Sequence, residues 1–290
     1  MGKRWGDRKD GTLLRDLDGM HFITPIIYPN RCDNEAFISE RIDLTKTDAY
    51  LEKKNADNPE YKYNLFQVIV TAALKTLTLR PKMNRFVANR NTYQRKEISA
   101  AFVVKKEFSD SGAEALAFIH SKPGDTIETV HNEIFRQVTS RRGENSTMED
   151  RSTDNMDMFN SMPRFLGKGI VRFLCFLDRH GWVPADLVAT DPYYASVVLT
   201  NLGSLGLHSG YHHLTNWGTN SLFVIIGERK ERHFFDAEGN ITMRDSVDIG
   251  LTIDERIADG YYYAKTMRLL KALIEDPEKL EGALSEPVEY

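Results

Sequence analysis

The sequence predicts a mixed α/β fold, with one large sheet and several covering helices. Two uninterrupted apolar runs, residues 197–200 and 222–227, are typical of strands buried on both faces of a sheet. Two other segments, residues 65–79 and 261–275, have apolar positions at helical spacing and predict amphipathic helices. No linker rich in Pro, Gly or Ser divides the chain, so we expect a single domain over residues 1–290.

The first part of the chain predicts an irregular start, two strands and a helix. Residues 1–19 are polar and lack a clear period, so we expect an irregular N-terminal segment. Residues 22–28 form an apolar run that predicts a strand, and residues 36–44 alternate with the period of a second strand. Residues 45–55 then favour a helix.

The middle of the chain begins with the helix at residues 65–79, which ends before Pro81 because proline disfavours a helical residue ahead of it. The elements expected next are a hairpin at residues 86–93, strands at 98–106 and 115–119, and a helix at 126–141. Residues 142–157 are charged and almost free of apolar side chains, so we expect an exposed loop.

The last part of the chain predicts further helices and strands. We expect a basic, apolar helix at residues 163–177, then the two buried strands, a hairpin turn at 236–240, a strand at 247–253 and the final helix. That helix ends at Pro277. The result is a large sheet with helices packed against it.

Composition excludes several classes of protein. A formal net charge of -4 gives no electrostatic reason to expect a nucleic-acid or membrane partner. The two cysteines, Cys32 and Cys175, fit neither a zinc site nor a redox pair, and such low usage is typical of a reducing compartment. The charged N-terminus is no signal peptide, and no apolar run is long enough to span a membrane. We therefore expect a soluble, cytoplasmic protein.

Three segments carry a specific pattern. Residues 254–260 read Asp-Glu-Arg-Ile-Ala-Asp-Gly, residues 199–206 read Leu-Thr-Asn-Leu-Gly-Ser-Leu-Gly, and residues 80–85 read Arg-Pro-Lys-Met-Asn-Arg. In order and spacing they resemble the catalytic domain of the CoA-dependent acyltransferases of 2-oxo acid dehydrogenase complexes and of chloramphenicol acetyltransferase. The motif of that family is Asp-His-Arg-x-x-Asp-Gly, so every element matches except the histidine, which is replaced by Glu255.

The resemblance implies a chloramphenicol acetyltransferase-like mixed sheet with covering helices, and acyl transfer between CoA and an acceptor. In such enzymes a histidine removes the proton of a thiol, and a hydroxyl stabilises the oxyanion of the tetrahedral intermediate. Thr200 and Ser204 are the nearest hydroxyls in this sequence. CoA or acyl-CoA would be a substrate, and no metal is expected.

The family's second motif aspartate is mainly structural and is held by an arginine. On that pattern Asp259 would pair with an N-terminal arginine, and the candidates are Arg8, Arg15 and Arg31.

With Glu255 in place of the histidine, the sequence leaves open which group, if any, acts as the base. A carboxylate is a poor base for a thiol, because its ordinary pKa lies about four units lower, unless burial raises it. One interpretation is that Glu255 is an unusual base, and another is that His208, His212 or His213 replaces the missing imidazole. A third is that the active centre is lost. A metal pair from these histidines is disfavoured, because Gly210 makes a helix between them improbable.

Two functions follow from these interpretations. The first is a stand-alone acyltransferase that acts on a small or carrier-bound acceptor. The second is an inactive binding or scaffold protein, a pseudoenzyme that keeps the fold. The family forms trimers, so either would be a homotrimer or a higher assembly of trimers. We expect no lipoyl domain in this chain.

Overall fold

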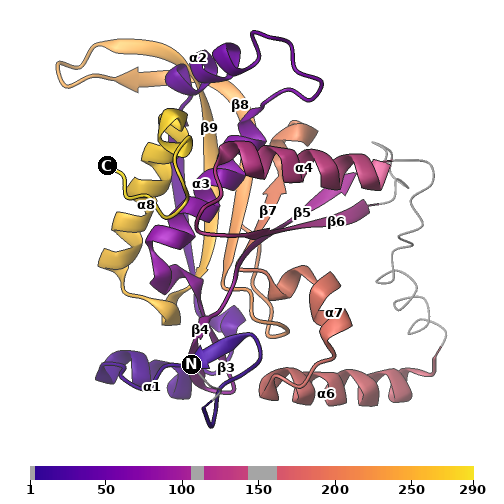
Figure 1. Cartoon of the computed structure of the whole chain (residues 1–290). Helices are drawn as coiled ribbons and strands as arrows, with labels where there is room; N and C mark the ends of the chain where they lie inside the picture. The colour runs from indigo at the N-terminus through magenta and orange to yellow at the C-terminus, as the bar shows by residue number, and fades with distance from the viewer. Residues whose placement is uncertain (1–3, 106–113, 143–161) are drawn as a thin grey trace.

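The computed structural model describes residues 4–105, 114–142 and 162–290, and its centre is a mixed sheet of six strands in the order β2-β9-β8-β7-β5-β6 (Figure 1). These strands are β2 (Glu35–Asp43), β5 (Ile98–Lys105), β6 (Glu114–Ser121), β7 (Val197–Asn201), β8 (Leu222–Phe235) and β9 (Ile241–Asp254). β7 pairs in parallel with β5 and with β8, and the remaining pairs are antiparallel. The predicted mixed α/β fold is confirmed.

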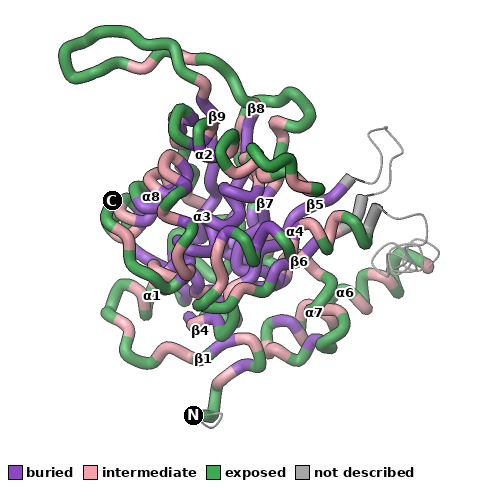
Figure 2. Tube along the Cα trace, turned by 45° about the horizontal axis from the view of Figure 1, so that its top comes forward, coloured by how far each residue is buried: buried purple, intermediate pink, exposed green. Residues whose placement is uncertain are grey.

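Helices α2 (Thr45–Lys54), α3 (Leu65–Leu79), α4 (Ile127–Arg142) and α8 (Gly260–Glu275) pack on the main core of this sheet. Helices α1 (Gly19–Ile27), α6 (Arg164–His180) and α7 (Ala185–Thr190) lie toward one end of the molecule (Figure 1). α3 and α8 supply much of the main core, together with alternate residues of the strands. Figure 2 shows this buried centre between α3, α8 and the sheet.

The helix predicted at residues 65–79 is confirmed at both ends. A reciprocal capping box begins it, because the Asn64 side chain accepts from the backbone N–H of Gln67 and the Gln67 side chain accepts from that of Asn64. Residues Gln67 to Leu77 are all buried, so α3 passes through the core rather than along its edge.

A small second sheet has the strand order β1-β4-β3. β3 (Arg85–Ala88) and β4 (Asn91–Arg95) form the predicted hairpin, and β1 (Gly11–Leu13) pairs with β4. The irregular segment expected at residues 1–19 therefore contains a strand. Only glycine fits at Gly11, because a Cβ there would lie 2.7 Å from the Phe86 ring.

The strand expected at residues 22–28 is wrong, because this segment is helix α1. Asp18 caps its first turn by accepting a hydrogen bond of 3.0 Å from the backbone N–H of His21. The apolar run suggested a buried strand, but the helix lies at the surface with an apolar stripe exposed. The side chains of that stripe are Met20, Phe22, Ile23, Ile26 and Ile27.

The strand at β2, the helices at α2 and α4, and the hairpin turn between β8 and β9 are confirmed within a few residues. The strands expected at 222–227 and 247–253 are longer than predicted, because β8 continues to Phe235 and β9 begins at Ile241. The helix expected at residues 163–177 extends to His180. Of the loop expected at residues 142–157, Arg142 ends α4 and residues 143–157 lie outside the described residues. In the part of the chain that the structure describes, no helix is long and apolar enough to cross a membrane.

Candidate functional site

The two predicted hydroxyls lie together where β7 ends. Thr200 is the fourth residue of β7 and is partly exposed. Its neighbour two positions earlier, Val198, packs on the sheet face opposite the main core, and strand alternation places Thr200 on that same outer face. Ser204 follows in a short 3-10 helix, where its Oγ donates to the carbonyl oxygen of Asn201 (2.8 Å). We call Thr200 and Ser204 the hydroxyl half-site.

Glu255 lies at the other end of the sheet, directly after β9. Its backbone N–H donates to the carbonyl oxygen of Asn34 (2.8 Å). Its side chain is exposed, and among the described residues its carboxylate has no hydrogen bond or ion pair.

Strand register separates these two parts of the expected site. Thr200 pairs with Ile225 of β8, and Ile225 pairs with Gly250 of β9. Glu255 follows Gly250 by five residues, which corresponds to about 16 Å along an extended strand. Within one chain, therefore, the structure does not bring Glu255 to the hydroxyl half-site.

A loop crosses the outer face of the sheet between these two ends, and we call residues 207–213 the histidine loop. Leu207 accepts from the backbone N–H of Glu228 (2.8 Å). The loop then lies directly on the strands, because both strand residues beneath it are glycines. A Cβ on Gly227 would be 2.4 Å from the Ser209 nitrogen, and one on Gly250 would be 2.0 Å from the Gly210 oxygen.

The imidazoles of the histidine loop lie toward different ends of the sheet. His208 Nδ1 lies 3.1 Å from Glu228 Oε1, at the end of the hydroxyl half-site. The His212 ring stacks on Phe223, with centroids 4.7 Å apart, and its Nδ1 is 3.2 Å from the carbonyl oxygen of His213. Phe223 pairs with Thr252, so His212 and His213 lie toward the end that carries Glu255.

These contacts favour one tautomer of each ring. A proton on Nδ1 that is held by an oxygen leaves Nε2 as the basic nitrogen, an arrangement that suits a general base. His208 and His212 both have such an oxygen. No group of three His, Cys, Asp or Glu side chains among the described residues could hold a metal ion.

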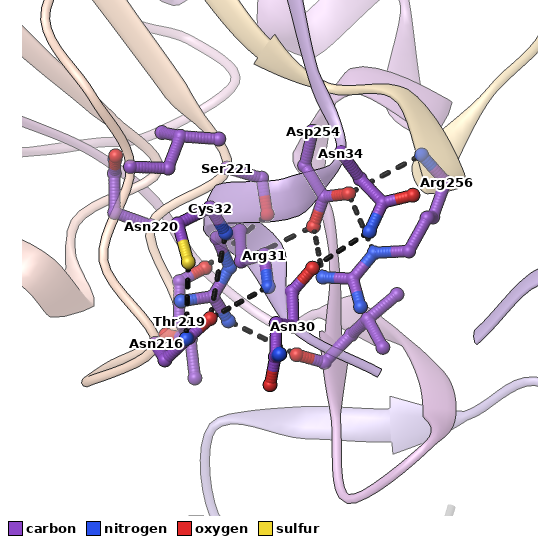
Figure 3. Close-up of polar contacts among 12 residues, drawn as sticks. Asn30, Arg31, Cys32, Asn34, Asn216, Thr219, Asn220, Ser221, Asp254 and Arg256 are labelled. Atoms are coloured by element: carbon purple, nitrogen blue, oxygen red, sulfur yellow. Dashed lines mark hydrogen bonds and ion pairs between the residues drawn. The ribbon is translucent and has the colours of Figure 1, made fainter. Parts of the chain in front are cut away.

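Behind Glu255 lies a buried ion cluster around Asp254 (Figure 3). Asp254 is fully buried and accepts two hydrogen bonds from the Arg256 guanidinium, at 2.8 and 2.7 Å. Arg31 lies against the same carboxylate at 3.6 Å, while its other nitrogens donate to the carbonyls of Thr215 and Val87. Burial lowers the pKa of Arg31, and the charge of Asp254 opposes that change.

The expected ion pair of Asp259 is not formed within the described chain. The Asp259 carboxylate instead caps α8 by accepting from the backbone N–H of Tyr262 (2.8 Å), which lowers the pKa of Asp259. Of the three candidate arginines, Arg8 pairs with Asp10, Arg15 donates to the carbonyl of Trp5, and Arg31 pairs with Asp254. Of the three candidates, Arg31 is therefore the one that pairs with an aspartate of the motif, and that aspartate is Asp254.

Comparisons with known proteins agree with this architecture. A family model, the 2-oxoacid dehydrogenases acyltransferase (catalytic domain), matches residues 187–281. The sequence matches none of the curated proteins with which it was compared.

Solved structures resemble the chain over nearly its whole length. A probable dihydrolipoamide acetyltransferase from Listeria monocytogenes 4b F2365 has a TM-score of 0.58 at 16% identity, over 94% of this chain and 99% of that chain. The cubic core of a pyruvate dehydrogenase multienzyme complex gives 0.59 at 13% identity, over 92% and 93%. A chloramphenicol acetyltransferase gives 0.53 at 13% identity, over 92% and 98%.

The resemblance carried by the three sequence segments is thus confirmed at the level of the fold. The chain has the CoA-acyltransferase fold of chloramphenicol acetyltransferase and of the dihydrolipoamide acetyltransferase cores, and residues 187–281 resemble the acyltransferase catalytic domain in sequence as well.

Proposed function

We propose that this chain is a CoA-dependent acyltransferase, which transfers an acyl group between CoA and a small or carrier-bound acceptor at a site shared by subunits of a homotrimer. The observation that carries this proposal is the separation of the hydroxyl half-site from the end of the sheet that carries Glu255 and lies nearer His212. A site that combines the hydroxyls with groups at that end needs that end of one chain to face the hydroxyl half-site of another.

Exposed apolar side chains near each end support such an assembly. Leu205 and Leu207 are exposed beside the hydroxyl half-site. At the other end the Arg256 guanidinium donates to the carbonyl of Tyr28, which places the apolar stripe of α1 next to the Glu255 segment. A second copy that covered these side chains would remove apolar surface from water. One protein of this fold forms the cubic core of a multienzyme complex.

The proposed reaction begins with the thiol of CoA or of the acceptor. An imidazole takes the thiol proton as the sulfur attacks the carbonyl carbon of the acyl donor. Thr200 or Ser204 donates a hydrogen bond to the resulting oxyanion. The tetrahedral intermediate then collapses, the donor sulfur leaves with its electron pair, and the imidazole returns the proton to that sulfur. The reaction needs no metal.

We assign the base to His212, which lies toward the Glu255 end of the sheet, rather than to Glu255. The His208 and His212 imidazoles each have Nδ1 near an oxygen, which favours a basic Nε2. The Glu255 carboxylate is exposed, and none of the described residues holds it in a defined direction. An imidazole also matches a thiol in pKa much better than a carboxylate does.

The first experiment incubates the protein with acetyl-CoA and dihydrolipoamide and measures S-acetyldihydrolipoamide by mass spectrometry. Replacing the base by His212→Ala should lower kcat on the order of a hundredfold or more. Glu255→Gln should change kcat only a few fold. A hundredfold loss in Glu255→Gln and none in His212→Ala would assign the base to Glu255 instead.

Subunit mixing tests whether the site is shared. The double variant Thr200→Ala with Ser204→Ala lacks the hydroxyls, and Glu255→Arg blocks the opposite end. Each homotrimer should be inactive, and subunits mixed after dissociation should regain activity. If mixing restores nothing although mixed trimers form, the shared site is wrong.

A second candidate function is an inactive trimeric binding protein, and the exposed, unpartnered Glu255 favours it. Glu255→His is the test. A gain of acyl transfer from an inactive wild type would show that only the base had been lost, which supports this second function. Activity in the wild type contradicts it.

A further inference from the structure

Helix α6 is the least covered long helix of the molecule. It lies along one edge of the structure, at the same end as α1 (Figures 1 and 2). Asp178, near its C-terminus, is its one buried residue. Asp178 accepts from the Tyr194 hydroxyl (2.7 Å) and from the backbone N–H of Gly218, so the helix is fixed to the rest of the chain at this end.

One exposed face of α6 is aromatic. Phe165, Phe173 and Phe176 are 78%, 60% and 49% exposed, and Trp182, just beyond the helix, is 60% exposed. At about 100° per residue the three phenylalanines fall within about 80° of one another around the helix axis. His180 continues this surface, since its ring stacks between Phe176 and Trp182 with centroids 4.4 and 4.8 Å away.

The neighbouring stripe of the same helix is cationic. Its members are Arg164, Lys168, Arg172 and Arg179. They also fall within about 80° of one another, next to the phenylalanines. None of the four has an ion pair or a side-chain hydrogen bond among the described residues, and the helix has no exposed carboxylate. This local charge contrasts with the net charge of -4 of the whole chain.

We propose that α6 docks the protein on an anionic lipid surface. A helix with separate aromatic and cationic faces and modest overall hydrophobicity lies in the plane of a membrane interface rather than across it. The phenylalanines would enter the boundary between headgroups and acyl chains, the four cations would face lipid phosphates, and Trp182 would lie at headgroup depth. With 17 residues, α6 is about 25 Å long and can rest along the surface.

Charge complementarity favours lipid over a protein partner. A groove on a second protein would have to supply a carboxylate for each unpaired cation at matching positions, whereas an anionic bilayer supplies phosphates at every position. The stripe of α1 differs, because its exposed side chains are apolar without a row of cations, which suits contact between subunits.

Vesicle flotation tests the proposal with the full-length protein. The wild type should float with vesicles of equimolar phosphatidylcholine and phosphatidylglycerol, much less with phosphatidylcholine alone, and less again in high salt. A variant with Phe165→Ser, Phe173→Ser and Phe176→Ser should lose binding on the order of a hundredfold. A variant with Arg164→Gln, Lys168→Gln and Arg172→Gln should lose a comparable factor.

Matched controls change the same residue types elsewhere. Phe235→Ser with Ile241→Ser and Met243→Ser removes exposed apolar side chains from the tip of the β8–β9 hairpin. Lys46→Gln with Lys62→Gln and Lys122→Gln removes three exposed cations. Both controls should float like the wild type, and circular dichroism should show that every variant is folded.

Three outcomes would overturn the proposal. The wild type could fail to float with anionic vesicles, or the hairpin control could lose as much binding as the α6 variant. The phenylalanine variant could also lower the mass of the protein by sedimentation without lipid, which would assign α6 to a protein interface. None of these outcomes depends on acyl transfer.

Discussion

Two adjacent carboxylates at the end of β9 have opposite environments. Asp254 is fully buried between two arginines, whereas Glu255 is exposed and unpartnered among the described residues. The Asp254 side chain lies on the outer face of the sheet, under Arg31 and the segment after the histidine loop. Glu255 begins the turn that follows β9, and its side chain is exposed. Substitutions at these neighbours should therefore act on different properties.

Asp254→Asn should lower the free energy of unfolding by about 3–5 kcal/mol, because it leaves two buried guanidiniums without their carboxylate. Urea denaturation measures the change. Glu278→Gln is the control, since Glu278 meets Lys53 at 3.8 Å on the surface and should contribute less than about 1 kcal/mol. Equal effects of the two substitutions would contradict a structural role of the buried cluster.

A buried histidine should make stability depend on pH. Burial lowers the pKa of His131, whose ring stacks on Tyr63 at 3.8 Å. Above the ordinary value of about 6.5 the imidazole is neutral in both states. As pH falls through this value the unfolded chain binds the proton first, so stability is lost until the lower, folded pKa is reached.

His131→Phe should therefore flatten the dependence of unfolding free energy on pH between about pH 7 and pH 5. Denaturant titrations at several pH values measure both slopes. His233→Phe changes an exposed histidine and serves as the control. Its unfolding free energy should depend on pH as that of the wild type does. If the unfolding free energies of the wild type and of His131→Phe depend on pH in the same way, His131 is not the group responsible.

At the scale of elements, the histidine loop depends on two glycines beneath it. Gly227 and Gly250 allow Ser209 and Gly210 to lie directly on β8 and β9, and no side chain would fit between them. The position of His208 and His212 follows from this contact.

Gly250→Ala should displace the histidine loop, because the added Cβ would lie 2.0 Å from the Gly210 oxygen. We expect a stability loss of about 1–3 kcal/mol and a larger proportional loss of acyl transfer. Hydrogen exchange of residues 207–213 should rise. Gly124→Ala, where a Cβ meets no atom within 4 Å, should change neither quantity. Unchanged exchange in Gly250→Ala would show that the loop does not depend on this contact.

The elements with a clear period could be predicted from the sequence, and α3, β2 and the β3–β4 hairpin are examples. α1 could not, because a short apolar run fits a strand and a surface helix equally well. The sequence named Thr200 and Glu255 as site residues, but it did not show how far apart they lie in one chain. That separation depends on register across β8, which local sequence does not contain. The pairing of Arg31 with Asp254 was missed for the same reason.

The net charge of the whole chain did not reveal the basic face of α6. The net charge of -4 predicted no membrane partner, yet the cations of α6 form one stripe with no ion pair to any residue that the structure describes. That stripe emerges only when exposure is known for each side chain, because a buried basic helix would have the same sequence.

At the scale of the whole molecule, the proposed function requires a closed trimer. Phe22→Ser with Ile26→Ser changes exposed side chains of the α1 stripe and should convert the trimer to monomers without unfolding the chain. Sedimentation equilibrium measures the mass. The hairpin variant Phe235→Ser with Ile241→Ser should remain trimeric, and a trimer that survives the α1 substitutions would place the interface elsewhere.

The central claim is an acyl-CoA site that exists only between subunits, and isothermal titration of the wild type and of the α1 variant with CoA tests it most directly. We predict one CoA bound per chain in the wild-type trimer and no measurable binding to the monomeric variant. Absence of CoA binding by the wild type, or equal affinity in the monomer, would contradict the account.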